Sequence, residues 1–361
     1  TPSVEDDSVG VEQFYIDYTQ RLTPKALIPT PLDAVYGDGV CRISGSARVV
    51  CRTEELMPVA HYLCQRVSLD LTTELEGAIR LGYDPMLEVE EYRLIVDERG
   101  VLVVGGGYGG VFNGVMTLLQ MLPETLYSGS VAYPVELPQC NISDRPRWGH
   151  RGFMLDVGRK FFTLDYLKQQ IKVMSFYKMN EFQIHLNDNG FPQFFDNDWN
   201  KTYAAFRLES ERFPGLTAKD GSYTKKEFTE LQRMGMAYGV NVIPEIDIPA
   251  HSLAFTHYKP EIGTQEYGMD HLDLYKEETY KFVDALLDEY MCGEEPVFIG
   301  PDVHIGTDEY NKKEAEQYRY FTDRYLKYVA SYGKTPRMWG GLKWLPGKTP
   351  VQAEGVTVNA W

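Results

Sequence analysis

The second half of the chain repeats one pattern, in which a short apolar run is followed by a polar loop and a segment with helical spacing. The first run covers residues 152–157, and apolar positions recur at helical intervals over residues 163–177. Such runs predict strands, and apolar residues three or four positions apart predict an amphipathic helix. Thr224 and Glu227 have the spacing of a capping box, which predicts the start of another helix. Further strands are predicted at residues 181–186, 239–244, 303–305, 337–339 and 356–361.

The alternation of strands with helices in this region favours a parallel sheet with helices packed around it. A parallel sheet with this many strand and helix units usually closes into a (β/α)8 barrel of the TIM type. In that architecture the residues at the carboxyl ends of the strands form the functional site. The pattern therefore predicts the α/β fold class.

The first part of the chain has a mixed pattern. Residues 91–96 alternate between apolar and polar positions, and a turn follows. Residues 101–104 are apolar and would form the returning strand, so the segment predicts a β-hairpin. Apolar residues then recur at helical spacing over residues 111–121, and Pro123 ends that helix. These elements predict a small α+β domain ahead of the barrel.

The boundary between the two patterns lies near residue 145. Residues 134–148 contain three prolines, and this composition predicts a linker. We therefore expect an α+β accessory domain over residues 1–145 and a catalytic barrel domain over residues 146–361.

Three glycines before the predicted helix of the first domain match the spacing of a dinucleotide-binding loop. They are Gly105, Gly107 and Gly110. No acidic residue follows about twenty positions on and no parallel strand is predicted after the helix, and a dinucleotide site requires both. We interpret these glycines as positions where a helix packs closely on a sheet.

Composition narrows the class of partner. Hydrophobic residues make up 43% of the 361 residues and aromatic residues 13%, which is enough for a full core. The formal net charge is −16, and no run of lysine and arginine could follow a phosphate backbone, so we expect no nucleic-acid partner. No apolar run approaches the length of a membrane span.

The cysteines do not have the spacing of a metal-binding set, because no two are separated by two to four residues. Cys41 and Cys51 flank a strand-like stretch and would be the candidates for a disulfide in an oxidising compartment. An odd number leaves at least one thiol free. The five are Cys41, Cys51, Cys64, Cys140 and Cys292.

Charged and aromatic side chains follow the carboxyl ends of the predicted strands. In residues 302–309 a β-branched run reaches a glycine and ends on Asp308 and Glu309. Neighbouring side chains on an extended chain point in different directions, so we expect these two carboxylates to have different roles. A solvated acidic turn is the alternative interpretation of such a pair. The other strand ends carry Asp156, Asp188, Glu245, Asp247, His251, Trp339 and Trp361.

This set combines acids, one histidine and two tryptophans without a basic cluster. Carboxylates and a histidine could hold a metal ion, as they do in other barrels. Aromatic rings around carboxylates suit a sugar better, because apolar sugar faces stack on the rings while carboxylates bind hydroxyl groups and protonate a glycosidic oxygen. We therefore expect a glycan substrate and no metal or other cofactor.

Five motifs, in the expected order, resemble those of glycoside hydrolase family 20, the β-N-acetylhexosaminidases. The similarity extends from about Ala26 to Trp361, and residues 91–122 resemble the small α+β domain that precedes the family's barrel. The resemblance implies a glycan or glycoconjugate substrate with a terminal 2-acetamido sugar, and no cofactor. The motifs lie at residues 151–162, 178–180, 185–188, 243–252 and 304–309.

The resemblance also implies a substrate-assisted retaining mechanism. Glu309 would protonate the leaving oxygen as general acid and then activate water as general base. Asp308 would orient the substrate's own acetamido group, whose carbonyl oxygen would be the nucleophile and give an oxazolinium intermediate.

Five further residues receive binding or support roles from the resemblance. Asp188 and His251 would tune the acid, and Arg151 would bind ring hydroxyl groups. A salt-bridging Arg151 and a satisfied loop histidine at position 251 are the structural alternatives. Trp339 and Trp361 would wall the pocket. Asp156 and Arg159 are interpreted as a brace of the barrel. Glu245 and Asp247 stay open between a site role and a bracing role, with bracing favoured.

The sequence departs from the family pattern at three places. Asn187 and Asn189 flank Asp188 where the family usually has threonine and aspartate, and Thr307 stands where a glycine is usual. The family's last two barrel strands, with a tyrosine that holds the acetamido oxygen, have no counterpart up to Trp361. We therefore expect a barrel that is truncated after its sixth strand.

Two functions from different classes follow from this sequence. The first is an exo-acting retaining β-N-acetylhexosaminidase that releases terminal N-acetylglucosamine or N-acetylgalactosamine. The second is a catalytically incompetent sugar-binding or scaffold fragment, and a metal-dependent barrel hydrolase is a third possibility. We expect an exported protein, periplasmic, at the cell surface or extracellular, because such substrates lie there and the chain begins with Thr1 rather than Met.

Overall fold

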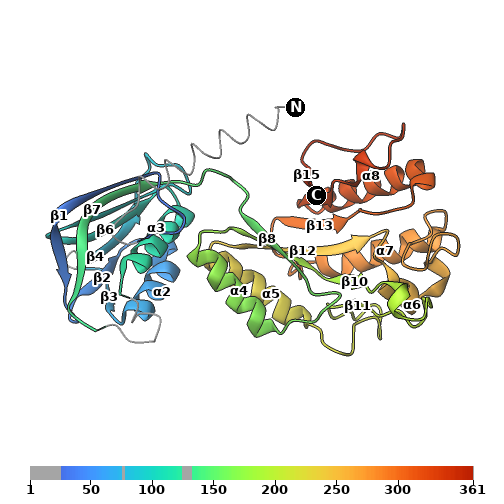
Figure 1. Ribbon diagram of the computed structural model, residues 1–361, viewed down its shortest axis with the longest axis horizontal. Helices are drawn as coiled ribbons and strands as arrows, with labels where there is room; N and C mark the ends of the chain where they lie inside the picture. The colour runs from blue at the N-terminus through green and yellow to red at the C-terminus, as the bar shows by residue number, and fades with distance from the viewer. Residues whose placement is uncertain (1–25, 75–77, 124–131, 361) are drawn as a thin grey trace. The chain divides into compact units, whose positions relative to one another are not determined.

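The computed structural model describes residues 26–74, 78–123 and 132–360, which form two compact units (Figure 1). The first unit contains the described residues up to Arg151 together with residues 172–179 and 237–239, and the second contains the rest. No helix in the described ranges is long and apolar enough to cross a membrane.

The first unit is built on a mixed sheet of seven strands in the order β1-β7-β5-β6-β4-β2-β3, with helices α2 and α3 on one face (Figure 1). The predicted hairpin is confirmed as β5 and β6, which pair antiparallel, and the predicted helix is confirmed as α3. Apolar side chains such as Leu63 of α2, Val103 of β6 and Val115 of α3 are buried together as its core. The elements are β1 (Asp33–Ile43), β2 (Arg48–Cys51), η1 (Glu54–Leu56), α2 (Met57–Val67), β3 (Asp70–Thr72), β4 (Ile79–Tyr83), β5 (Tyr92–Asp97), β6 (Gly100–Gly105), α3 (Tyr108–Met121) and β7 (Val135–Asp144).

The linker predicted at residues 134–148 is wrong over most of its length, because β7 pairs with β1 on one side and with β5 on the other. Proline cannot donate a backbone hydrogen bond, which is why three prolines indicated a break. Pro138 is tolerated because the pairing of β7 with β5 ends at Cys140. On the other side its partner Val40 adjoins an irregularity in the β1 register.

Cys41 and Cys51 do not form the disulfide considered above, and both thiols are free and buried. Cys41 lies on β1 and Cys51 on β2. Four strands separate these two in the sheet, which is far beyond the reach of a disulfide.

Glycines at the junction of β6 and α3 let the helix approach the sheet closely. A Cβ atom at Gly105 would lie 2.3 Å from the backbone nitrogen of Val111, and one at Gly110 would lie 2.2 Å from the carbonyl oxygen of Glu91. Among the described residues, the strand that follows α3 is β7, which pairs antiparallel with both of its neighbours. The packing interpretation of the glycines is therefore confirmed.

The second unit is built on six parallel strands in the order β8-β9-β12-β13-β14-β15. All six predicted strands are confirmed, and neighbours in the sheet are consecutive along the chain, which is typical of a (β/α) barrel. The strands of this sheet are β8 (Gly152–Asp156), β9 (Glu181–His185), β12 (Asn241–Ile248), β13 (Asp302–Gly306), β14 (Thr335–Trp339) and β15 (Thr357–Asn359).

Helices and short strands fill the connections of this sheet (Figure 1). The predicted capping box precedes α5, where the backbone N–H of Glu227 donates to Thr224 Oγ1 at 3.1 Å and that of Thr224 donates to Glu227 Oε2 at 2.8 Å. The connecting elements are α4 (Leu164–Phe176), β10 (Asn187–Asn189), η3 (Pro192–Phe194), β11 (Ala204–Phe206), α5 (Lys225–Ala237), α6 (Leu253–Tyr258), η4 (Pro260–Ile262), α7 (Glu277–Met291), η5 (Lys312–Glu314), α8 (Ala315–Ser331) and η6 (Gly341–Lys343).

The register of the parallel strands aligns charged residues across the sheet. Asp156 pairs with His185, His185 with Glu245, Glu245 with His304, and His304 with Arg337. Because parallel strands end at the same edge, residues that follow this row meet beyond the carboxyl ends of the strands.

We expect Gly105→Ala to destabilise the first unit by about 1–3 kcal/mol, because overpacking forces the helix and the strand apart. Gly82→Ala on the neighbouring strand β4 is the matched control, since a Cβ atom there would meet only Val104 Cγ1, at 4.0 Å. Urea unfolding followed by circular dichroism compares the two variants with the parent. Equal stability of the two variants would contradict the packing account.

Candidate functional site

Asp188 is a buried carboxylate that accepts hydrogen bonds from several sides. His185 Nε2 lies 2.7 Å from one oxygen, and His251 Nδ1 lies 2.9 Å from the other. Arg159 Nη1 lies 2.6 Å from Oδ2. Burial alone would raise the pKa of Asp188, but hydrogen bonds from the two histidines hold it well below its usual range. Asp188 is therefore an anion that fixes three surrounding side chains.

His251 connects Asp188 to the acid pair. Its Nε2 lies 3.3 Å from Glu309 Oε2 and 3.6 Å from Asp308 Oδ2. Burial opposes a charge on the ring, but the carboxyl groups of Asp247 and Asp188 and the hydrogen bond with the acid raise the pKa of His251 to about 12. The ring is therefore an imidazolium at neutral pH, with both N–H groups available to donate.

Glu309 is the most accessible member of this group, with 57% of its side chain exposed. The hydrogen bond from His251 lowers the pKa of Glu309, more than partial burial raises it. His251, Thr307 and Glu309 all have left-handed backbone angles, with φ of 52°, 71° and 50°. Such strain is costly for a β-branched residue such as Thr307, and proteins concentrate it at functional sites.

Asp308 faces a second carboxyl group, that of Asp247. Burial and the charge of Asp308 raise the pKa of Asp247 well above its usual range, and burial also raises the pKa of Asp308. Two buried carboxyl groups that interact in this way disfavour ionisation of both at once. The backbone N–H of Thr307 donates to Asp247 Oδ1 at 3.2 Å. A Cβ atom at Gly306 would lie 1.7 Å from Asp247 Oδ1, so glycine makes room for this carboxyl group.

The next buried carboxylate is that of Glu245, which contacts residues of the site. Its carboxylate is fully buried and accepts hydrogen bonds from Gln183 Nε2 and Trp339 Nε1, each at 2.7 Å. Burial raises its pKa, but the charges of His185 and His304 lower the pKa of Glu245 to about 2. Trp339 is thereby fixed by its indole N–H, and its ring lies edge to face with His304 at 4.9 Å.

Several of these side chains line a cavity of 490 Å³, which we call the acid pocket. Its volume lies within the range of small-molecule sites. Five of the predicted site residues line it, Asp188, His251, Asp308, Glu309 and Trp339. Trp361 lies outside the described residues, and its role stays a prediction. The remaining lining residues are Met154, Asp156, Arg159, His185, Phe191 and Asp247.

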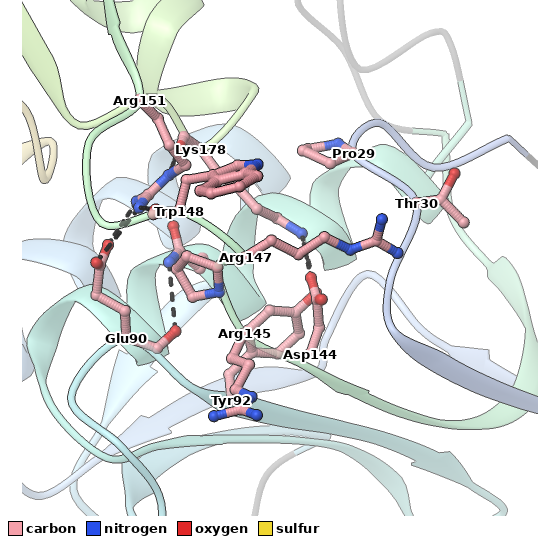
Figure 2. A pocket seen from close by; sticks show the side chains of 12 residues that line it. Pro29, Thr30, Glu90, Tyr92, Asp144, Arg145, Arg147, Trp148, Arg151 and Lys178 are labelled. Atoms are coloured by element: carbon pink, nitrogen blue, oxygen red, sulfur yellow. Dashed lines mark hydrogen bonds and ion pairs between the residues drawn. The ribbon is translucent and has the colours of Figure 1, made fainter. Parts of the chain in front are cut away.

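Arg151 is not among the residues that line the acid pocket. It belongs to the first unit, where its guanidinium pairs with Glu90 Oε1 at 2.6 Å and donates to the carbonyl oxygen of Lys178 at 2.7 Å (Figure 2). This is the salt-bridge arrangement that was the alternative for Arg151. Contact of Arg151 with a substrate stays a prediction.

The sequence-based interpretation did not place Arg159 and Asp247 at the pocket, and both of them line it. Arg159 does brace Asp156, at 3.0 Å, but the same Nη1 also reaches Asp188 and the side chain lines the pocket. The signal for both residues was present, since each follows or ends a strand at the edge where the acids meet. The sequence does not give the distances that show whether such a side chain only stabilises the barrel or also lines the pocket.

Among the residues that the structure describes, three overlapping sets of donors bring their ligand atoms within 4.8 Å of one another. They are Asp156 with His185 and Asp188, His185 with Glu245 and Asp247, and Asp247 with His251 and Asp308. In two of these sets other charged groups already contact the donors. Asp188 receives the guanidinium of Arg159, and the two ring nitrogens of His251 face the carboxyl groups of Asp188 and Glu309.

Two family models match the chain. The model described as glycosyl hydrolase family 20, catalytic domain, matches residues 148–361. The model described as domain 2 of the same family matches residues 25–145.

Individual relatives agree with these models. A beta-hexosaminidase of Porphyromonas gingivalis is 30% identical over 318 residues, which are 78% of this chain and 38% of that relative. A beta-hexosaminidase of Akkermansia muciniphila is 30% identical over 315 residues, which are 77% of this chain and 59% of that relative. The chain thus spans less than two thirds of the length of either. The solved structure of the GH20 beta-N-acetylhexosaminidase from Streptomyces coelicolor A3(2) matches with a TM-score of 0.80 and 28% identity, over 93% of this chain and 69% of that one.

We expect Asp188→Asn to lower the free energy of unfolding by about 3–5 kcal/mol at neutral pH, because buried cationic groups lose their counter-charge. The folded-state pKa of Asp188 lies below its ordinary value of 3.8, so this stabilisation is complete above that value and is lost as the pH falls below it. Glu277→Gln removes an exposed ion pair with Lys281 and should change the free energy of unfolding far less than Asp188→Asn. Urea unfolding at neutral pH measures both, and a loss at Asp188 no larger than the control's would sink the charge account.

Proposed function

Because the chain belongs to glycoside hydrolase family 20, we propose that it is an exo-acting β-N-acetylhexosaminidase of the retaining type. It would release terminal N-acetylglucosamine or N-acetylgalactosamine from a glycan. The observation that carries this proposal is the meeting of Asp308, Glu309 and the His251 imidazolium at one pocket beyond the strand ends. The names of the relatives, beta-hexosaminidases, support the same substrate class.

The first step uses the substrate's own acetamido group. Its carbonyl oxygen attacks the anomeric carbon while Glu309 gives its proton to the glycosidic oxygen, the bond to the leaving sugar breaks, and an oxazolinium ion forms. Asp308 accepts the amide N–H and balances the positive charge that develops there. Only 14% of the Asp308 side chain is exposed, and preorganised charge of this kind is the largest contribution in many enzymes.

The second step returns Glu309 to its starting state. As a carboxylate it takes a proton from water, whose oxygen attacks the anomeric carbon and opens the oxazolinium ring, so the product keeps the substrate's configuration. The imidazolium of His251 stabilises the carboxylate between the two steps. In the resting site Glu309 is half exposed and its pKa is lowered, so a bound sugar that excludes water from it would favour the protonated acid.

The alternative of a sugar-binding or scaffold fragment without turnover is not favoured. The catalytic-domain model matches residues 148–361, and Asp188, His251 and Asp308 line the same pocket as Glu309. Export of the protein remains part of the proposal, because glycans with terminal 2-acetamido sugars are mostly found outside the cytoplasm.

A matched pair of variants tests the two carboxylates on two leaving groups. Glu309→Gln should lose about 10²–10⁴ in rate on a glycoside with a poor leaving group and little on an aryl glycoside with a good one, since only the former needs protonation. Asp308→Asn should lose activity on both, because attack by the acetamido group is required in each case.

Each of the two variants is assayed on a chromogenic aryl glycoside and on a disaccharide, which gives four rates. The corresponding 2-hydroxy glucosides should be inert with the parent protein. Equal losses of Glu309→Gln on both leaving groups would contradict the general-acid role. Turnover of the 2-hydroxy glucosides at a similar rate would contradict assistance by the acetamido group.

A further inference from the structure

Glu309 lines a second cavity besides the acid pocket. This cavity has a volume of 470 Å³ and is lined by Glu309, Tyr310, Lys312, Gly341, Trp344 and Leu345, and we call it the Trp344 pocket. A general acid lies between the sugar that is cleaved and the group that leaves, because its proton goes to the oxygen that joins them. If the acid pocket takes the terminal sugar, the Trp344 pocket is the space for the leaving group.

Two adjacent strands bring the walls of this pocket together. β13 leads into Glu309 and then into η5, which begins at Lys312, and β14 leads into η6, which ends at Lys343. β13 and β14 pair in parallel, so both connections emerge at the same edge of the sheet. Trp344 follows η6 directly, and 53% of it is exposed. An exposed indole beside a catalytic carboxyl group is a surface on which a sugar can stack.

Two ammonium groups lie at the Trp344 ring. Lys312 Nζ is 5.7 Å and Lys343 Nζ 5.4 Å from the ring centroid, distances at which a cation is attracted to the aromatic face. Both lysines are exposed. Within the described part of the chain, neither has a carboxylate within 4.0 Å, although the protein as a whole carries a net charge of −16. Two lysine charges thus lie beside the carboxyl group of Glu309 at this pocket, in an otherwise acidic protein.

The carboxyl groups of Glu314 and Glu316, which lie near Lys312 in sequence, accept hydrogen bonds from neutral donors. Glu314 accepts hydrogen bonds from the hydroxyl groups of Tyr267 and Tyr275. Glu316 accepts the backbone N–H groups of Lys348 and Thr349, at 2.7 and 2.8 Å. These bonds lower the pKa of both carboxyl groups.

We propose that the Trp344 pocket binds the leaving sugar and selects one that carries an anionic group, a carboxylate or a sulfate, paired with Lys312 and Lys343. The inference rests on the proposed function and adds the substrate class on the leaving side. Trp344 would stack on the apolar face of that sugar while the two ammonium groups bind its anion. The anion takes no part in bond breaking, so its effect is on binding of the leaving sugar and not on proton transfer.

Three disaccharides with the same terminal N-acetylglucosamine test the proposal on the full chain. The leaving sugar is glucose, glucuronic acid or a sulfated glucose, and kcat/KM is measured for each at low and high salt. The parent protein should prefer an acidic leaving sugar by about three- to tenfold at low ionic strength, and salt should reduce the preference because the lysines are exposed.

The double variant Lys312→Gln/Lys343→Gln should lose that preference and keep its rate on the neutral disaccharide within about twofold. Lys226→Gln/Lys281→Gln is the matched control, since it removes two exposed lysine charges, from α5 and α7, and should keep the preference. A preference for one acidic sugar over the other supports the proposal and identifies the anion.

Equal rates of the parent protein on all three sugars, or a preference that survives in the double variant, would overturn the inference while leaving the proposed function intact. Failure to cleave any of the three, together with failure on an aryl N-acetylglucosaminide, would overturn both.

Discussion

The buried carboxylate of Asp188 is the constraint on which the rest of the site depends. A negative charge without water is costly, and here it is balanced by His185, His251 and Arg159 at hydrogen-bond distance. Each of these side chains is fixed in direction by the same anion. The orientation of His251 toward Glu309 is therefore a consequence of electrostatic balance and not of an isolated contact.

From Asp188 the charges alternate along the site. The imidazolium of His251 lies between two anions, Asp188 and Glu309, and burial raises the pKa of the next carboxyl group, that of Asp308. Burial and the charge of Asp308 raise the pKa of Asp247 well above its usual range, because a further fully ionised carboxylate would add negative charge to a buried group. The close approach of Asp247 is possible only because position 306 is glycine.

Much of this arrangement was predictable from the sequence, because periodicity fixes which segments are strands and parallel strands end at one edge. This reasoning brought Asp188, His251, Asp308 and Glu309 together before any distance was known. It failed at β7, where prolines indicated a linker although Pro138 lies beyond the residues that pair with β5. It also gave no indication of the Trp344 pocket. Lys312 and Lys343 are far apart in sequence, and they meet only because β13 and β14 are neighbours.

The charge state of His251 tests the central claim most directly. Protein labelled with ¹⁵N in histidine, compared with His251→Ala to assign the signal, reports ring protonation by nuclear magnetic resonance. The account predicts an imidazolium with both nitrogens protonated across the neutral range and beyond, since the pKa is raised from 6.5 to about 12. A ring that titrates near the ordinary histidine value, or that is a neutral tautomer at neutral pH, would contradict it.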